Sequence, residues 1–383
     1  MHKKRALYTY EFRNMWGALI VGAVMAVLGC VCVLFYCDRS QSMRAISEVF
    51  QDAVYPSALN EIPIRIGNDF SSGLHEILRM GCVFIIPVFA LLTFLLFRVG
   101  HKRAQEEYFS SLPFTETEKF RARLFTGYGI ITVVAILFSV GVLLIRERYI
   151  EYIYYDMLTT SLYRELLSTE TIWMTLSNLL VFWLVMIACY TIFVAMHTIL
   201  NSGMWATIVG VMFIFGPSAL TESLIDTFYR EEFFETQQKI YRYASILVNG
   251  DNNSCNLYYV PLDNPYVEEV TVGYAEYMNS FVVAGILLGA IALAMFVAFY
   301  HRRKRDMAKQ NCLVAGKKTR IVLSVLVGIG VGKLLGSLLE YFFMVEYLDN
   351  AAYVSLGIWA VCSVIGFFVC NRLFRKKVSG GMI

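Results

Sequence analysis

Two glycine–lysine pairs are the residues of this chain that come nearest to nucleotide chemistry. A phosphate-binding loop needs G-x-x-x-x-G-K-S/T, in which backbone amides hold the phosphates and the final hydroxyl binds Mg²⁺. Gly332-Lys333 is followed by Leu334 and lies in an apolar run, and Gly316-Lys317 lacks the leading glycine. We therefore expect no ATP-binding or other cofactor site in this chain, and any ATP it depends on must be hydrolysed by a separate subunit.

Other groups that do chemistry are scattered along the chain. The five histidines lie mostly at the ends of apolar runs, and no H-E-x-x-H or G-x-S-x-G pattern occurs. The nine cysteines show no pair of C-x-x-C motifs, so the sequence predicts no metal site. The acidic pair Glu231-Glu232 is explained more simply by a solvated loop than by acid–base catalysis. We expect no enzyme activity, and a disulfide between Cys37 and Cys255 stays open.

One lysine lies inside an apolar run. A charge at mid-bilayer costs about 2.5–3.5 kcal/mol on the insertion scale, so Lys333 should face a partner carboxylate or a wet cavity, or extend to the outer interface. Glu340 shares its helix face but is too far along the chain for a direct pair. A functional role and a structural ion pair both remain open for Lys333.

Three glycines in the same run repeat every fourth residue, at Gly328, Gly332 and Gly336. This spacing puts them on one helix face, and small residues there let two helices approach closely. Dense packing within one subunit is the favoured interpretation, and a dimer interface is the alternative.

The most informative polar stretch lies between two apolar runs, at Arg98–Arg123. Thr115 and Glu118 fit the capping box S/T-x-x-E, which predicts a helix that starts there and continues into the next run. Pro113 should end a preceding short helix, Lys102–Ser111.

The result is a short surface helix, a rigid corner and then a long helix. Such a device can transmit force from a soluble partner to a membrane helix, and an ordinary amphipathic loop is the alternative. The candidate residues of this corner are Tyr108, Phe109, Leu112, Pro113, Phe114, Thr115, Glu116, Glu118 and Lys119.

Apolar runs of about 20 residues must position these groups. Hydrophobic residues make up 57% of the chain, and a helix of about 20 residues matches the roughly 30 Å hydrocarbon core of a bilayer. Pro87 should interrupt the second run, and Gly216-Pro217 should kink or end the fifth. We predict an all-α integral membrane protein with about eight transmembrane helices: Gly17–Tyr36, Ile77–Phe97, Phe125–Ile145, Trp173–Met196, Trp205–Leu224, Asn279–Tyr300, Ile321–Glu340 and Ala352–Asn371.

Charge sets the expected orientation. With both termini inside, 22 basic residues lie in inner segments and 10 in outer segments. The positive-inside rule then predicts N-in and C-in topology. The basic start precedes an apolar run that is too long for a signal peptide and has no small-x-small cleavage site, so we expect a retained helix.

Three further segments have expected roles. Leu7–Trp16 reads as an amphipathic helix lying in the inner interface. The outer segment Ile225–Met278 should begin with a helix over Ile225–Val248 and end in a turn-rich loop. The tyrosine-rich segment Arg146–Thr171 is a third outer segment, which could lie along the membrane surface.

The inner corner also carries a resemblance to a known family. The phrase Tyr-x-x-x-Leu-Pro-Phe-Thr-x-x-Glu-Lys-Phe, at residues 108–120, resembles the first cytoplasmic loop of bacterial ABC-2-type permeases, the membrane-spanning subunits of ABC exporters. The basic run after the sixth span, with Asp306, resembles in part a motif of relatives that have two extra helices, although Lys309 replaces their usual glycine.

The resemblance implies a six-helix core plus two C-terminal helices. Residues 1–300 would form the core, with the coupling loop at 98–124 and an outer segment at 225–278. Residues 301–320 would be a basic cytoplasmic linker, and residues 321–383 two more spans and a basic tail. It also implies a multi-pass protein of the cytoplasmic membrane, paired with a second permease subunit and with cytoplasmic ATPase subunits. The alternative is a membrane-embedded sensor or scaffold that uses the outer segment as a receiver.

Overall fold

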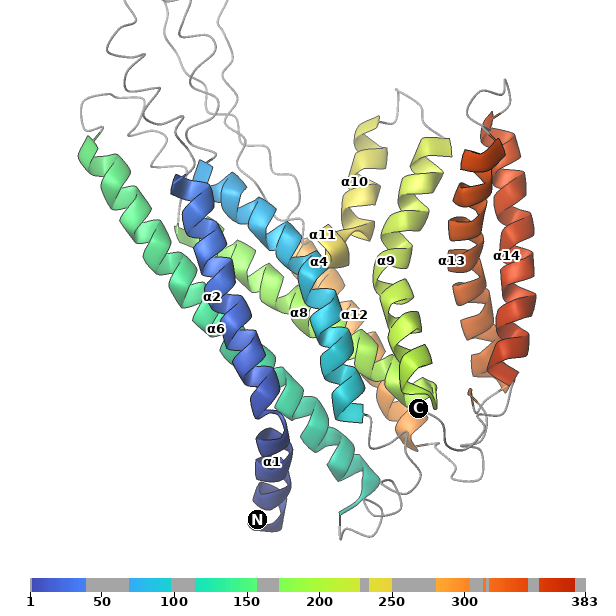
Figure 1. The fold of residues 1–383 in the computed structure, drawn as a ribbon, viewed down its shortest axis with the longest axis horizontal. Helices are drawn as coiled ribbons and strands as arrows, with labels where there is room; N and C mark the ends of the chain where they lie inside the picture. The colour runs from blue at the N-terminus through green and yellow to red at the C-terminus, as the bar shows by residue number, and fades with distance from the viewer. Residues whose placement is uncertain are drawn as a thin grey trace, which may run out of the picture.

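The computed structural model describes nine ranges of the chain: 2–38, 69–97, 114–156, 172–227, 234–249, 280–303, 313–314, 317–343 and 351–375. These residues are almost entirely helical, with one isolated β-bridge between Leu200 and Val314. Eight of the helices are long and apolar enough to cross a membrane, and each overlaps one predicted span (Figure 1). They are α2 (Trp16–Asp38), α4 (Asp69–Phe97), α6 (Glu116–Asp156), α8 (Ile172–Ile199), α9 (Gly203–Thr227), α12 (Ser280–Arg303), α13 (Lys317–Phe343) and α14 (Ala351–Arg375).

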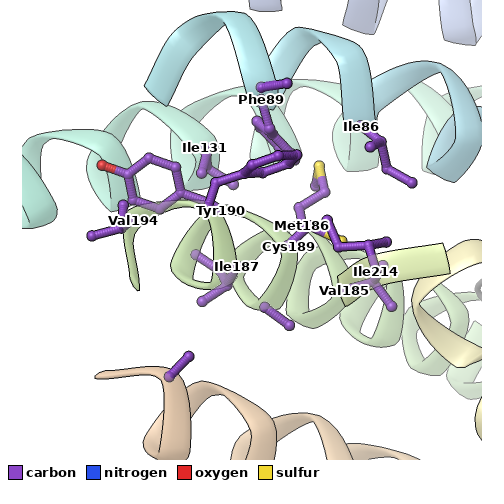
Figure 2. Close-up of a cluster of buried hydrophobic side chains, with 14 of the residues drawn as sticks. Ile86, Phe89, Ile131, Val185, Met186, Ile187, Cys189, Tyr190, Val194 and Ile214 are labelled. Carbon is purple, nitrogen blue, oxygen red and sulfur yellow. The ribbon is translucent and has the colours of Figure 1, made fainter. Parts of the chain in front are cut away.

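Helix α8 is the centre of the bundle. Within its apolar window 83% of residues are buried by protein, against 11% in α2. It packs against α4, α6, α9 and α12. Its Phe193 is fully buried, as is its Tyr190 (Figure 2). The outward faces of the surrounding helices carry exposed leucine, isoleucine and valine side chains. A protein that is apolar on its outside as well as in its core is suited to lipid rather than water.

Helices α2 and α6 cross at close range on small residues. A β-carbon at Gly22 would lie 2.6 Å from Val134, and one at Gly29 would lie 2.9 Å from Phe138. Both distances are shorter than ordinary van der Waals contacts, so a larger side chain at either glycine would require the Val134 or Phe138 side chain, or the helices themselves, to move.

Helix α6 is longer than the span predicted for it. It has 41 residues, which corresponds to about 60 Å, or twice the thickness of the hydrocarbon core. The expectation of a surface segment from Arg146 is wrong as far as Asp156, because the helix continues to that residue. The remainder of that segment, 157–171, lies outside the described residues.

Both prolines expected to disturb a span lie inside continuous helices. Pro87 is within α4 and Pro217 is within α9. The Thr221 hydroxyl donates a hydrogen bond of 2.8 Å to the Pro217 carbonyl. The possibility that Gly216-Pro217 ends the fifth span is therefore wrong, since neighbouring helices support a proline in the membrane.

After α9 the chain turns back into the bundle. Helix α10 (Phe234–Ala244) packs beside α9, and the four-residue α11 (Ile246–Asn249) reaches α4, α8 and α9 (Figure 1). The Cys189 thiol, near the middle of α8, donates to the Leu247 carbonyl at 3.9 Å. The predicted helix Ile225–Val248 is thus three pieces, the end of α9, α10 and α11, and the last of them lies deep in the membrane region.

The N-terminal helix α1 (His2–Asn14) is present but lies differently from the expectation. It runs beside the first turns of α6, in nearly the same direction as α2, rather than across the end of the bundle (Figure 1). Leu7 and Glu11 of α1 and Met15 in the turn that follows it are buried and recur every four residues, so one face of α1 is packed on protein. We call this end of the bundle, where α1, the start of α6 and the end of α12 lie, the α1 end.

Helices α13 and α14 form a hairpin at one side of the other six spans, next to α9 (Figure 1). Its contact with α9 includes Trp205 and Phe374, whose rings are 6.5 Å apart in an edge-to-face arrangement. Among the described helices, α13 and α14 thus form a separate pair that packs against α9.

Candidate functional site

The predicted corner residues fall partly within the described structure. Tyr108, Phe109, Leu112 and Pro113 lie outside it, as does the short helix Lys102–Ser111. The described part begins at Phe114, which precedes the first turn of α6.

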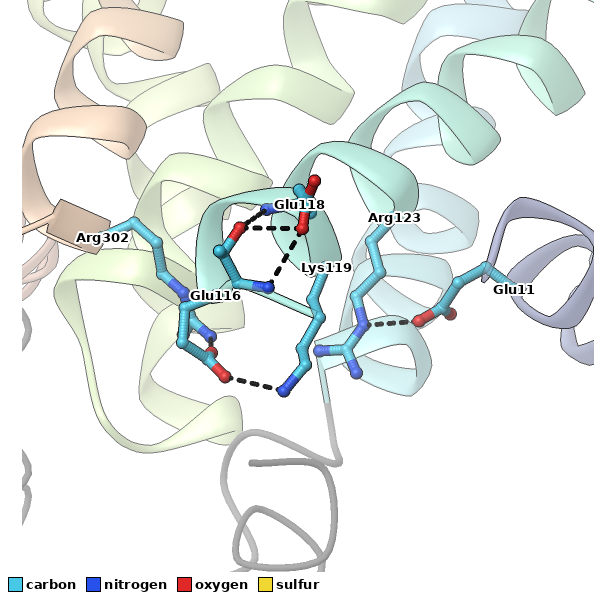
Figure 3. A network of polar contacts seen from close by, with 7 residues as sticks. Glu11, Glu116, Glu118, Lys119, Arg123 and Arg302 are labelled. Atoms are coloured by element: carbon cyan, nitrogen blue, oxygen red, sulfur yellow. Dashed lines mark hydrogen bonds and ion pairs between the residues drawn. The ribbon is translucent and has the colours of Figure 1, made fainter. Parts of the chain in front are cut away.

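The capping box at the start of α6 is formed. The Thr115 amide donates to the Glu118 carboxylate at 3.1 Å, and the Glu118 amide donates to the Thr115 hydroxyl at 3.2 Å (Figure 3). These reciprocal bonds satisfy two amide groups that a helix otherwise leaves free. The prediction that a helix starts here and runs into the third span is confirmed.

Glu116, one residue further on, joins two helices. Its carboxylate accepts from Lys119 at 3.1 Å and also pairs with Arg302, near the end of α12 (Figure 3). Lys119 is buried, whereas Glu116 is partly exposed. The contact ties the first turn of α6 to the last turn of α12, which is 186 residues away in sequence.

An aromatic cluster lies directly behind this ion pair. The Phe120 ring meets Phe299 of α12 edge-to-face at 5.2 Å and lies 6.2 Å from Phe97 at the end of α4. Phe97 stacks in turn on His197 of α8, with ring centroids 5.7 Å apart. A displacement of the first turns of α6 must therefore also displace α4, α8 or α12.

A buried ion pair holds α6 to α1. The Arg123 guanidinium donates to the Glu11 carboxylate at 3.1 Å, and both side chains are less than 10% exposed (Figure 3). Burial raises the pKa of Glu11 above its ordinary value, although Arg123 opposes this shift. Breaking one side of such a pair leaves a buried charge without compensation, at a cost of about 3–5 kcal/mol.

Hydrogen bonds continue from this point along the α6–α8 interface. The Arg123 carbonyl accepts from the Tyr190 hydroxyl at 3.3 Å. One turn further, the Tyr128 and Thr191 hydroxyls are 2.8 Å apart. A β-carbon at Gly127 would overlap the Tyr190 ring, so this glycine lets the tyrosine lie against α6.

The Glu11–Arg123 ion pair and the buried Tyr190 were not predicted from the sequence. The signal for Glu11 was present, because a carboxylate stands in the apolar stripe of Leu7 and Met15. For Tyr190 no signal existed, since a tyrosine in an apolar run is ordinary.

The intramembrane residues lie in the hairpin, away from the α6 corner. Lys333 points its ammonium over the Trp359 ring, 4.4 Å from the centroid. This cation–π contact within the chain is an arrangement that the sequence did not predict. Gly328, Gly332 and Gly336 all face α14 of the same chain. Glu340 lies near the C-terminal end of α13, two turns beyond Lys333.

No protein-family model, curated protein or solved structure matches this chain. What the fold defines is an all-α, multi-pass membrane protein with eight helices that can span a bilayer. Among its described residues, no group of three or more histidine, cysteine or acidic side chains is placed to hold a metal ion.

Proposed function

We propose that this protein is the membrane-spanning subunit of an ATP-binding cassette exporter. A separate cytoplasmic ATPase would act on the corner before α6. The observation that carries the proposal is the capped first turn of α6, which is tied to both α1 and α12 and forms the end of the phrase that resembles an ABC-2-type coupling loop.

The stiffness of the first turn of α6 supports this proposal. A loop that ends in a capping box passes its motion to the helix, because the first turn is held by two side-chain hydrogen bonds. Glu116 and Arg123 then share that motion with α12 and α1. A push on the loop would move α1, α6 and α12 as one unit, which is the kind of rigid rearrangement that alternating access requires.

The proposed assembly has two permease subunits, identical or related, and two ATPase subunits. Their ATP-driven closure would tilt α4 and α6, the two spans on either side of the inner loop. A path between the two membrane halves would then open outward. The direction of transport and the orientation with both termini in the cytoplasm belong to the proposal.

The first test is a mild-detergent pull-down of the tagged full chain, with mass spectrometry of the proteins that co-purify. We expect a stoichiometric P-loop ATPase. A variant with Leu112→Ala and Glu118→Ala should lose it, and Gly330→Ala, a change in open space on α13, should retain it. Recovery of the wild-type chain alone, from membranes in which candidate ATPases are expressed, would refute the proposal and favour the sensor or scaffold.

A charge exchange separates transmission from docking. Glu116→Lys should leave the ATPase bound but alter its rate of ATP hydrolysis, because α6 is no longer tied to α12. The double variant Glu116→Lys with Arg302→Glu reverses the pair and should restore the rate. Because Glu116→Lys also places a lysine beside Lys119, Arg302→Gln alone provides a second test. If the double variant is as impaired as Glu116→Lys and Arg302→Gln hydrolyses ATP at the wild-type rate, Glu116 does not act through Arg302.

A further inference from the structure

The hairpin concentrates positive charge at its α1 end. Helix α13 begins there and α14 ends there (Figure 1). Neither helix has an acidic residue in that half, and the acids of α9 are in its last two turns, at the opposite end. The basic residues at this mouth of the hairpin are Lys317, Lys318, Arg320, Arg372 and Arg375.

The register of the two helices is fixed by their glycine contacts. The two helices run antiparallel: for every four residues forward along α13, the residue of α14 that a β-carbon would touch lies four residues earlier. The contacts are Gly336 with Trp359, Gly332 with Ser363 and Gly328 with Phe367.

Both helices continue regularly toward the mouth, so the same register extends by two more turns. It places Ser324 opposite Asn371 and then Arg320 opposite Arg375. The extended register brings two arginines to the same level of the hairpin, at the edge of the membrane-spanning segments Lys317–Glu340 and Val354–Arg375.

Several features make this mouth favourable for an anion. Arg320 is half-buried and Arg375 is exposed, and two guanidinium groups at the same level repel one another unless an anion lies between them. The N-terminus of α13 adds the positive end of its helix dipole and its free amide groups. The Arg320 Nε atom and the Ser324 hydroxyl are buried, and neither has a hydrogen-bond partner among the residues that the structure describes.

The mouth is also held in place on the core. The Asn201 amide donates to the Leu313 carbonyl at 3.0 Å, and the adjacent bridge joins Leu200 to Val314. These contacts fix the chain three residues before α13, at the junction of α8 and α9. Since Phe374 packs on Trp205 at the start of α9, both sides of the mouth are anchored.

We propose that the mouth of the hairpin binds the phosphate of an anionic phospholipid, with Arg320 and Arg375 on either side of it. The ligand is a lipid because the two arginines lie at the ends of membrane-spanning segments, at the depth of the headgroups, where basic pockets between helices recognise anionic lipids. This site does not depend on the proposed transport activity.

The test uses the full chain in nanodiscs of phosphatidylcholine with increasing phosphatidylglycerol, and compares thermal unfolding and lipids retained in native mass spectrometry. Wild type should be stabilised by phosphatidylglycerol and retain it selectively. Arg320→Gln with Arg375→Gln should lose that retention, by about fivefold per removed charge. The variant with Arg303→Gln and Lys239→Gln, which removes two exposed charges elsewhere, should behave as wild type.

The two lipids also give opposite orders of stability. In pure phosphatidylcholine the Arg320/Arg375 double variant should be at least as stable as wild type, because the repulsion is gone. In phosphatidylglycerol it should be the less stable protein. Lower stability of the variant in both lipids would show a structural role only and overturn the proposal.

Two further results would also overturn it. One is equal stabilisation of wild type by inorganic phosphate in phosphatidylcholine, which would make the ligand a soluble anion. The other is loss of the stability difference between the two lipids in the Asp306→Asn variant, which leaves both arginines in place. Asp306 is the one acidic residue between α12 and α13 in the sequence. Lysine at both arginine positions should preserve most of the lipid preference, which keeps the test valid if the glutamine variant fails to fold.

Discussion

Replacement of Gly332 by alanine tests how closely α13 and α14 approach. A β-carbon there would lie 2.5 Å from both the Cα and the amide nitrogen of Ser363, whereas ordinary contacts begin at 3.4 Å. Because these are backbone atoms, no side-chain rotation relieves the overlap. The two helices would have to separate by about 1 Å, and overpacking of this kind costs about 1–3 kcal/mol.

The control is two residues away on the same helix. A β-carbon at Gly330 would meet nothing within 4 Å, so Gly330→Ala should be neutral or slightly stabilising, since alanine favours the helix by up to about 1 kcal/mol. Thermal unfolding of the purified proteins in one detergent should therefore show a clear loss for Gly332→Ala and none for Gly330→Ala. Intrinsic fluorescence is a suitable signal, because Trp359 lies in the same seam.

A second change distinguishes backbone contact from side-chain contact. Ser363→Ala removes the hydroxyl but leaves the Cα and nitrogen atoms in place, so it should not rescue Gly332→Ala. Equal stability of the Gly332→Ala and Gly330→Ala proteins would refute the close approach, and with it the register from which the arginine pair was placed.

Two further predictions concern the α1 end. Glu11→Gln removes a carboxyl whose folded-state pKa is raised by burial, so the wild-type chain binds that proton more tightly when folded. The stability of wild type relative to Glu11→Gln, measured as the difference in unfolding temperature, should therefore rise as the pH falls through the raised pKa. It should level off below about 4.5, the ordinary pKa of a glutamate. A decrease in this difference at low pH would contradict burial as the main cause of the shift. Thr115→Ala removes the capping hydroxyl and should cost about 1 kcal/mol of stability, while Thr115→Ser should cost much less. Chemical denaturation of the three proteins in detergent would measure this difference, and equal values would refute a role for the cap.

The spans and the start of α6 were predictable because local signals encode them. Length and hydropathy define each apolar run, and the Thr115–Glu118 spacing defines the cap. The position of Gly332 against α14 was foreseen as one of two options, because small-residue spacing indicates close packing without naming the partner helix.

The rest depends on contacts between distant segments. Glu11 and Arg123 are 112 residues apart in sequence, and nothing in either local pattern names the other. The path of α10 and α11 was missed because Ile246 and Val248 are equally apolar in a surface loop and in a membrane core. Pro217 was misleading, since the cost of a proline in a helix depends on its neighbours.

The depth of α11 has a consequence for the order in which the protein is built. A helix of four residues leaves most of its backbone groups unsatisfied, so it cannot enter a bilayer alone. It needs α4, α8 and α9 around it, and all three precede it in the chain. The ribosome therefore delivers this segment only after its surroundings have been made, and it can fold against them before α12 is inserted.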